Sequence, residues 1–177
     1  MSRRDQILDV ALELLERDGV ESLTMRSIAE AVGMRAPSLY KHVPDKRSLE
    51  AGLIARGLAA QAGVFERAAR KRSPLAALAQ AYRGWAREHP HLYRLMTDGP
   101  LPRDLLPPGV EAAAAAPLLA VTGNVGRARA LWGLAHGLVS LELAGRFPPG
   151  ADVDAAWRVG IAAFAATTTG SRSRSTS

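Results

Sequence analysis

The sequence contains no cysteine among its 177 residues. This absence excludes disulfide bonds, thiolate zinc sites and cysteine nucleophiles, and it is compatible with a reducing compartment. Long apolar runs are also lacking, because residues 112–126 and 130–141 are interrupted by Pro117 or His136 and are shorter than the roughly 18 residues of a spanning helix. The N-terminus is charged and carries no apolar signal core. We therefore expect a soluble, cytoplasmic protein with no membrane partner.

The residue patterns that are typical of enzyme active sites are missing as well. No nucleophile-base pair, carboxylate pair or phosphate-binding loop is recognisable. His89 and His91 are two residues apart at the start of a predicted helix, where they would not face each other, and no carboxylates cluster nearby. We predict no catalytic site, no metal site and no cofactor. A small helical enzyme is the alternative that these absences disfavour.

What the sequence does have is a net charge of +6 and 47% apolar residues. The charge favours an anionic partner such as nucleic acid, and the apolar content is sufficient for an ordinary core. The apolar residues recur at three- and four-residue spacing, and no stretch alternates as a strand would. Capping residues, glycines and prolines divide the chain into segments. The sequence therefore predicts an all-α fold, with helices over residues 3–18, 24–32, 37–42, 45–70, 74–88, 90–97, 110–121, 125–145 and 152–168.

Residues 24–42 have the pattern of a helix-turn-helix. Thr24 can cap a short helix, Gly33 suits the turn, and Pro37 suits the first turn of a second short helix. In this motif the second helix enters the major groove of DNA. Leu39 and Val43 are expected to face inward, while the outward side chains can reach base edges or phosphates. The candidate DNA-binding residues are Thr24, Arg35, Ala36, Pro37, Ser38, Tyr40, Lys41, His42 and Lys46. A solvated polar helix end is the plainer interpretation of the same residues.

The run ILDVALELLERDGVESLTMRSIAEAVGMRAPSLYKHVPDKRSL resembles the N-terminal DNA-binding domain of the TetR family of bacterial transcriptional regulators. The segment LYKHVPDKRSL is most similar to the tetracycline-repressor branch of the family. Further along, ALWGLAHGLVSLELAGRF resembles a C-terminal motif of one TetR subgroup, with Trp132, His136-Gly137 and Glu142 at the matching places. Glu142 is either a half-buried partner of an arginine or histidine, or simply exposed.

The resemblance implies a homodimeric regulator with a small-molecule effector. It divides the chain into a three-helix DNA-binding domain at 1–48 and a helical-bundle regulatory and dimerisation domain at 49–169. Residues 170–177 lack apolar side chains and are expected to form a disordered tail. The expected function is that of a ligand-responsive repressor that binds a palindromic double-stranded DNA operator. The alternative is a helical ligand-binding or scaffolding dimer without sequence-specific DNA binding. The sequence identifies neither the effector nor the operator, and it does not decide between repressor and activator.

Two further sets of residues are candidates in the C-terminal part. The first set could line an effector pocket, although aromatic residues at helical spacing are core residues by default and a lone histidine on an apolar helix is often structural. It comprises Tyr82, Trp85, Tyr93, Met96, Trp132 and His136. The second set could form a dimer seam, because the last two helices hold more large apolar residues than one small bundle needs. It comprises Leu138, Leu141, Trp157, Ile161 and Phe164.

Overall fold

Helices are the only regular secondary structure in residues 2–169, the part of the chain described by this computed structural model. The predicted all-α class is confirmed. The segment 170–177, predicted to be a tail, lies outside the described residues. The elements in chain order are α1 (Arg3–Asp18), the 3₁₀ helix η1 (Val20–Ser22), α2 (Met25–Ala31), α3 (Ala36–Tyr40), α4 (Lys46–Ala69), α5 (Pro74–Glu88), α6 (Pro90–Thr97), α7 (Val110–Thr122), α8 (Val125–Leu143) and α9 (Val153–Thr169).

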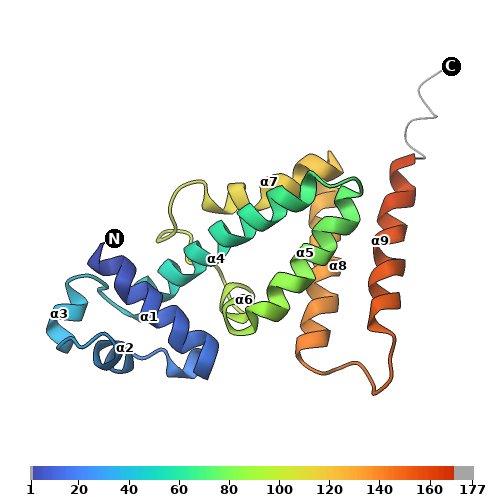
Figure 1. The fold of residues 1–177 in the computed structure, drawn as a ribbon. Helices are drawn as coiled ribbons and strands as arrows, with labels where there is room; N and C mark the ends of the chain where they lie inside the picture. The colour runs from blue at the N-terminus through green and yellow to red at the C-terminus, as the bar shows by residue number, and fades with distance from the viewer. Residues whose placement is uncertain (1, 170–177) are drawn as a thin grey trace. The chain divides into compact units, whose positions relative to one another are not determined.

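The helices form two compact units (Figure 1). Of the described residues, the first unit contains 2–60 and 89–113, and the second contains 61–88 and 114–169. The long helix α4 contributes to both units, and so does α7. The predicted boundary after residue 48 separates a DNA-binding domain from a regulatory domain. The two compact units have other boundaries, because α6 comes from the second half of the sequence and packs on α1 in the first unit.

The first unit is organised around α1. Ser2 and Asp5 form a capping box: the Ser2 hydroxyl accepts from the Asp5 amide at 3.1 Å, and the Asp5 carboxylate accepts from the Ser2 amide at 3.0 Å. The hydrogen bond from Ser2 lowers the pKa of Asp5. One face of α1 is then buried against the rest of the unit, and Gly19, with φ of +81°, ends the helix in a conformation that favours glycine. The core of this unit includes Ile7, Leu8, Leu15, Leu23, Ile28, Leu39, Val43, Leu49 and Leu53.

A carboxylate of α1 also fixes the start of α6. Glu16 accepts a hydrogen bond from the backbone amide of Leu92 at 3.1 Å, and its Oε1 lies 3.8 Å from Nδ1 of His89. Pro90 occupies the first position of α6, and the His89 side chain provides no cap of its own. Glu16 therefore does for α6 what a local capping residue does for most helices, since it satisfies one of the free amides at the N-terminus.

The second unit is built on α5, α8 and α9, which pack against one another pairwise (Figure 1). Arg83 of α5 connects all three: it forms two hydrogen bonds with Glu142 of α8, pairs with Asp154 of α9, and its guanidinium carbon lies 5.6 Å from the ring centre of Trp157. The hydrogen bonds that Arg83 donates to the Glu142 carboxylate raise the pKa of Arg83. The predicted possibility that Glu142 has an arginine partner is therefore confirmed. Buried residues of this unit include Leu78, Tyr82, Trp85, Leu131, Ala135, Val139 and Trp157.

Candidate nucleic-acid interface

The turn between α2 and α3 is shaped by its capping residues and one glycine. Thr24 precedes α2, and its hydroxyl accepts a hydrogen bond from the Ser27 amide at 3.0 Å. Gly33 has φ of +65°, a conformation that costs other residues about 1–2 kcal/mol. The chain then turns back, and the Met34 amide donates to the Ala29 carbonyl at 2.8 Å. The predicted cap and the predicted turn are both confirmed.

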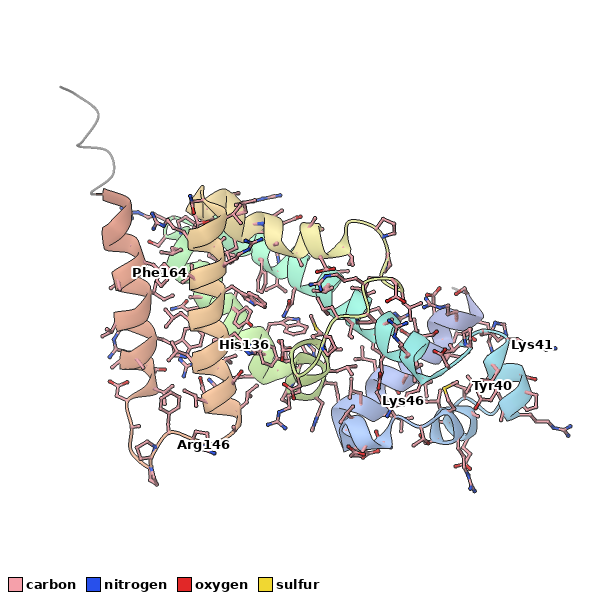
Figure 2. The ribbon with its side chains drawn as sticks, turned by 180° about the vertical axis from the view of Figure 1, so that it is seen from behind. Tyr40, Lys41, Lys46, His136, Arg146 and Phe164 are labelled. Carbon is pink, nitrogen blue, oxygen red and sulfur yellow. The ribbon has the colours of Figure 1, made fainter. Side chains whose placement is uncertain are left out.

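α3 presents one apolar side to the core and the rest of its surface to solvent. Leu39 is fully buried and Val43, just beyond the helix, is 1% exposed. Around them, Arg35, Ala36, Pro37, Ser38, Tyr40, Lys41 and His42 are all exposed. Figure 2 shows Tyr40 and Lys41 at the end of α3. The seven residues thus share an accessible surface that can offer a guanidinium, hydroxyls, an ammonium and an imidazole to DNA.

The start of α4 adds a further cation beside this surface. Asp45 caps the helix, with its carboxylate accepting from the Ser48 amide at 2.6 Å. Hydrogen bonding by the Ser48 hydroxyl, and then by its amide, lowers the pKa of Asp45. Because Asp45 already satisfies that amide, the Lys46 side chain is the better candidate for a phosphate contact. Lys46 is about half exposed and its ammonium lies 3.7 Å from Glu50, close enough for a weak ion pair. A phosphate would have to compete with Glu50 for the ammonium.

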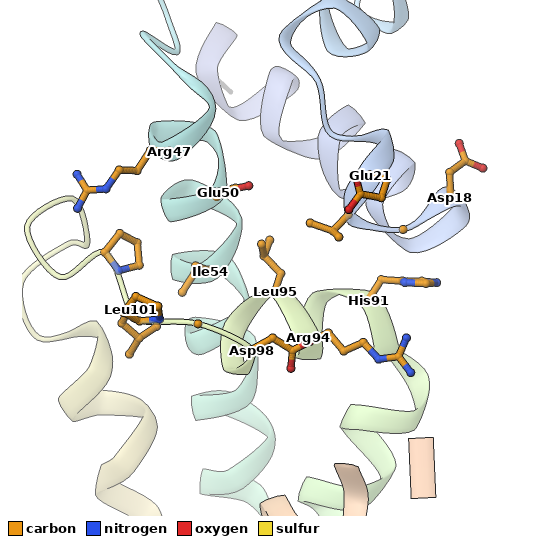
Figure 3. Close-up of a pocket in the computed structure, with 15 residues that line it drawn as sticks. Asp18, Glu21, Arg47, Glu50, Ile54, His91, Arg94, Leu95, Asp98 and Leu101 are labelled. Carbon is orange, nitrogen blue, oxygen red and sulfur yellow. The ribbon is translucent and has the colours of Figure 1, made fainter. Parts of the chain in front are cut away.

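A groove of about 790 Å³ lies elsewhere in the first unit (Figure 3). Glu21 of η1, Glu50 of α4, Leu95 of α6 and the segment 99–102 all line it. Its lining includes none of the six residues predicted for an effector pocket. Its charged lining consists of the carboxylates of Asp18, Glu21, Glu50 and Asp98 and the guanidiniums of Arg47 and Arg94, so side chains of both signs face it.

The six candidate effector residues fall into both units. Tyr82 and Trp85 are buried on α5 in the second unit, whereas Tyr93 and Met96 are buried on α6 in the first. Trp132 is 53% exposed on α8, and its ring centre lies 6.3 Å from that of the half-buried His136. The rings of Tyr82 and Phe65 stack at 6.0 Å. A pocket lined by these residues stays a prediction.

The candidate dimer residues differ in exposure. On α8, Leu138 is half-buried and Leu141 is 46% exposed. On α9, Trp157 is buried beneath Arg83, and Ile161 and Phe164 are half-buried. Val159, which sequence reasoning did not select, is 71% exposed. The dimer seam stays a prediction, and the exposed side chains of Leu141, Val159 and Trp132 are among the apolar groups available to it.

Sequence reasoning also passed over Gln61, which is the buried polar residue in the described part of the chain. The only hint in the sequence was a single carboxamide on an otherwise apolar helix face, and such a residue is as compatible with an exposed position as with a buried one.

The histidines do not form a metal site: residues 2–169 contain no group of three or more His, Asp or Glu that could hold an ion. Within the same range, no helix combines the length and the apolar character needed to cross a bilayer.

The first helix, α2, is capped and is followed by a glycine turn. The second helix, α3, buries one leucine and exposes its other side chains. This arrangement defines a helix-turn-helix DNA-binding domain. Residues 7–51 match the family model "Bacterial regulatory proteins, tetR family", and residues 75–164 match "Tetracyclin repressor-like, C-terminal domain". The chain therefore belongs to the TetR family of transcriptional regulators.

Three similar proteins illustrate the relationship. The uncharacterized HTH-type transcriptional regulator Rv0681 of Mycobacterium tuberculosis is 33% identical over 156 residues, which cover 80% of this chain and 71% of that protein. The class D tetracycline repressor of Escherichia coli is 46% identical over 46 residues, covering 26% and 21%. The crystal structure of TetR-Q116A from Acinetobacter baumannii AYE in complex with minocycline has the same fold, with a TM-score of 0.71, 24% identity, and coverage of 98% and 99%.

Proposed function

We propose that this TetR-family regulator is a ligand-responsive repressor that binds a palindromic DNA operator as a homodimer. The observation that carries the proposal is the exposed surface of α3 with Lys41 and Tyr40, supported from below by Leu39 and Val43. Such a surface holds its side chains in a fixed register, as base recognition requires. Because bacterial chromosomal DNA lies in the cytoplasm, a regulator that binds it acts in the cytoplasm.

A palindrome follows from the symmetry of a dimer. Two identical recognition helices related by a twofold axis read two identical half-sites, whose centres are about one helical turn (~34 Å) or a multiple of it apart. The exposed apolar side chains Trp132, Leu141 and Val159 on α8 and α9 support an association through these two helices. One protomer leaves these groups in water, and a second copy would cover them.

The response to an effector needs two states of the dimer. A small molecule releases DNA only if it binds the DNA-incompetent state more tightly, and a shift of the population from 1:99 to 99:1 takes about 5.5 kcal/mol of differential binding. The second unit supports such a site because its buried aromatic residues, among them Tyr82 and Trp85, form the kind of apolar surface that ligand sites use. The minocycline complex of the Acinetobacter baumannii protein is an example on the same fold.

The test of the proposal is selection of bound duplexes from a random pool at one stated, moderate salt concentration, since phosphate contacts make affinity depend on salt. We expect an enriched palindrome with half-sites spaced by one turn. Enrichment of a single half-site would contradict the dimeric mode. Failure to enrich any sequence would contradict specific DNA recognition and would favour the helical ligand-binding dimer instead.

A further inference from the structure

The residue that follows Lys46 on α4, Arg47, is held by a carboxylate from a distant part of the chain. Its guanidinium donates to both carboxylate oxygens of Asp104, with Nη1 to Oδ2 at 2.8 Å. Asp104 lies 57 positions further on, in the loop between α6 and α7, and both residues belong to the first unit. Figure 3 shows the Arg47 side chain pointing away from α4 toward this loop. The pair therefore joins the start of α4 to a segment outside the helix-turn-helix.

Arg47 is also placed where a DNA phosphate can reach it. It belongs to the first turn of α4, beside the candidate phosphate ligand Lys46. The Cα–Cβ bonds of an α-helix tilt toward its N-terminus, so a long side chain in the first turn can extend past the start of the helix. Arginine binds phosphate and carboxylate in the same way, through two parallel N–H groups. Asp104 therefore occupies N–H groups of Arg47 that a phosphate would use.

The pair is exposed enough to be exchanged for a phosphate. The Arg47 side chain is 56% exposed and the Asp104 side chain 63%. Exposed ion pairs contribute little to stability, because water and salt screen them. Duplex DNA, by contrast, carries one negative charge for about every 1.7 Å of its axis. We infer that Arg47 is a phosphate-binding residue of the DNA interface, and that Asp104 competes with DNA for its guanidinium. The inference rests on the proposed function, because it adds a contact to the binding of DNA.

The origin of the carboxylate gives this competition a consequence that the neighbouring pair lacks. Lys46 lies 3.7 Å from Glu50, one turn along the same helix, so that weak pair does not depend on other segments. Asp104 belongs to the loop that joins α6 to α7, so the Arg47 pair depends on where this loop lies. A displacement of the loop would release Arg47 and strengthen DNA binding without any change in α3.

The competition is tested with the natural protein, Arg47→Ala, Asp104→Asn and the double variant. Each is titrated with one duplex of fixed, arbitrary sequence over a range of salt concentrations. We expect Arg47→Ala to weaken binding and to reduce the slope of log affinity against log salt by up to about 0.9, the value for one lost phosphate contact. Asp104→Asn should strengthen binding about two- to fivefold, the worth of an exposed ion pair, and should have no effect when residue 47 is already alanine.

Glu111→Gln is the matched control for Asp104→Asn. It also removes a carboxylate that pairs with an exposed arginine, Arg103, and it changes the net charge equally. We expect it to leave DNA affinity nearly unchanged. Arg47→Lys is the conservative variant: it keeps the charge but loses the two-pronged geometry, so it should retain the salt slope of the natural protein. Circular dichroism checks that every variant is folded.

An unchanged salt slope in Arg47→Ala would overturn the inference. A gain from Asp104→Asn that persists in the double variant, or that Glu111→Gln reproduces, would reduce it to a general charge effect and overturn it too. Weaker binding by Asp104→Asn would mean that the pair orders the interface instead of competing with DNA. The duplex selection tests the repressor function separately. An enriched palindrome with an unchanged slope would leave that function standing, whereas no enriched sequence with the expected slopes would refute it and leave Arg47 as a phosphate contact.

Discussion

Arg83 and Glu142 form a two-pronged ion pair between α5 and α8, with Nε to Oε2 at 2.8 Å and Nη2 to Oε1 at 2.9 Å. Both side chains are more than four-fifths buried, at 19% and 17% exposed. The pair joins residues 59 positions apart in the sequence. It therefore fixes the relative placement of two helices that the chain connects only through a long intervening segment.

Removing one partner of this pair should be strongly destabilising. We expect Glu142→Ala to lower the free energy of unfolding by about 3 kcal/mol, because Arg83 would remain buried without its main counter-ion. Chemical denaturation gives the measurement. Arg87 provides the control, since it is exposed and lies 3.6 Å from the same Glu142. Arg87→Ala should cost less than about 1 kcal/mol. If the two substitutions lowered the free energy of unfolding equally, the buried pair would contribute no more to stability than the exposed one.

Asp154 should make stability depend on acid pH. The hydrogen bond from Arg83 holds the pKa of Asp154 below its ordinary value of 3.8. A lowered folded-state pKa contributes stability above pH 3.8, and that contribution disappears as the pH falls through the folded-state value. Asp154→Asn should therefore be less stable than the natural protein at pH 7, with the difference closing in strong acid. Unfolding midpoints measured from pH 7 to pH 2 test this, and a difference that stays constant over that range would contradict it.

The recognition surface makes a direct prediction for DNA binding. Tyr40→Ala with Lys41→Ala should reduce affinity for the selected operator at least tenfold, because both side chains are exposed and neither supports the core. Binding titrations at several salt concentrations provide the measurement, with circular dichroism to check the fold. Arg67→Ala removes an exposed cation from the far part of α4 and serves as control. Unchanged affinity of the double variant would disprove the assignment of α3 as the recognition helix.

Replacing Gly33 by alanine should lower stability only because of the backbone conformation at this position. A Cβ atom there would meet no other atom within 4 Å, so only the positive φ of +65° opposes it. We expect Gly33→Ala to cost about 1–2 kcal/mol of stability. Gly84 is the matched position, because it is equally open but lies within helix α5. Gly84→Ala should stabilise the protein by up to about 1 kcal/mol. Thermal unfolding of both variants decides the point, and the prediction fails if they shift in the same direction.

The dimer seam can be tested by placing charge on it. Leu141→Glu with Val159→Glu should convert a dimer to a monomer, because both side chains are exposed on α8 and α9 and a second copy would bury the added carboxylates. Light scattering at micromolar concentration measures the mass. Leu105→Glu changes an exposed leucine in the first unit, at 39% exposed against 46% for Leu141, and should leave the dimer intact. A natural protein that is already monomeric would contradict the seam outright.

The sequence allowed local features to be predicted and left most long-range ones open. Thr24, Gly33 and Asp45 act on amides or dihedral angles within a few residues of themselves, so their roles could be derived from neighbouring letters alone. The helix ranges followed from the same caps and from apolar spacing. The short 3₁₀ helix η1 carries no such pattern and was not predicted.

The remaining features depend on packing between distant segments. That Glu142 meets Arg83, and that Glu16 meets the start of α6, follows from how the helices assemble, which no local pattern specifies. The same reason explains Gln61: whether a glutamine on an apolar helix face is exposed or buried is decided by what covers that face. Effector and dimer residues share this difficulty, because their identity depends on surfaces formed only after folding.

The bond between Glu16 and Leu92 also bears on how this protein is made. The two residues are 76 positions apart, and the segment that completes the first unit, residues 89–113, is synthesised only after the first half of the chain. Until then α1 has no α6 to cover it. The first unit is therefore incomplete during the first half of translation, and a single cut of the gene after residue 60 would separate α1 from the α6 that packs on it.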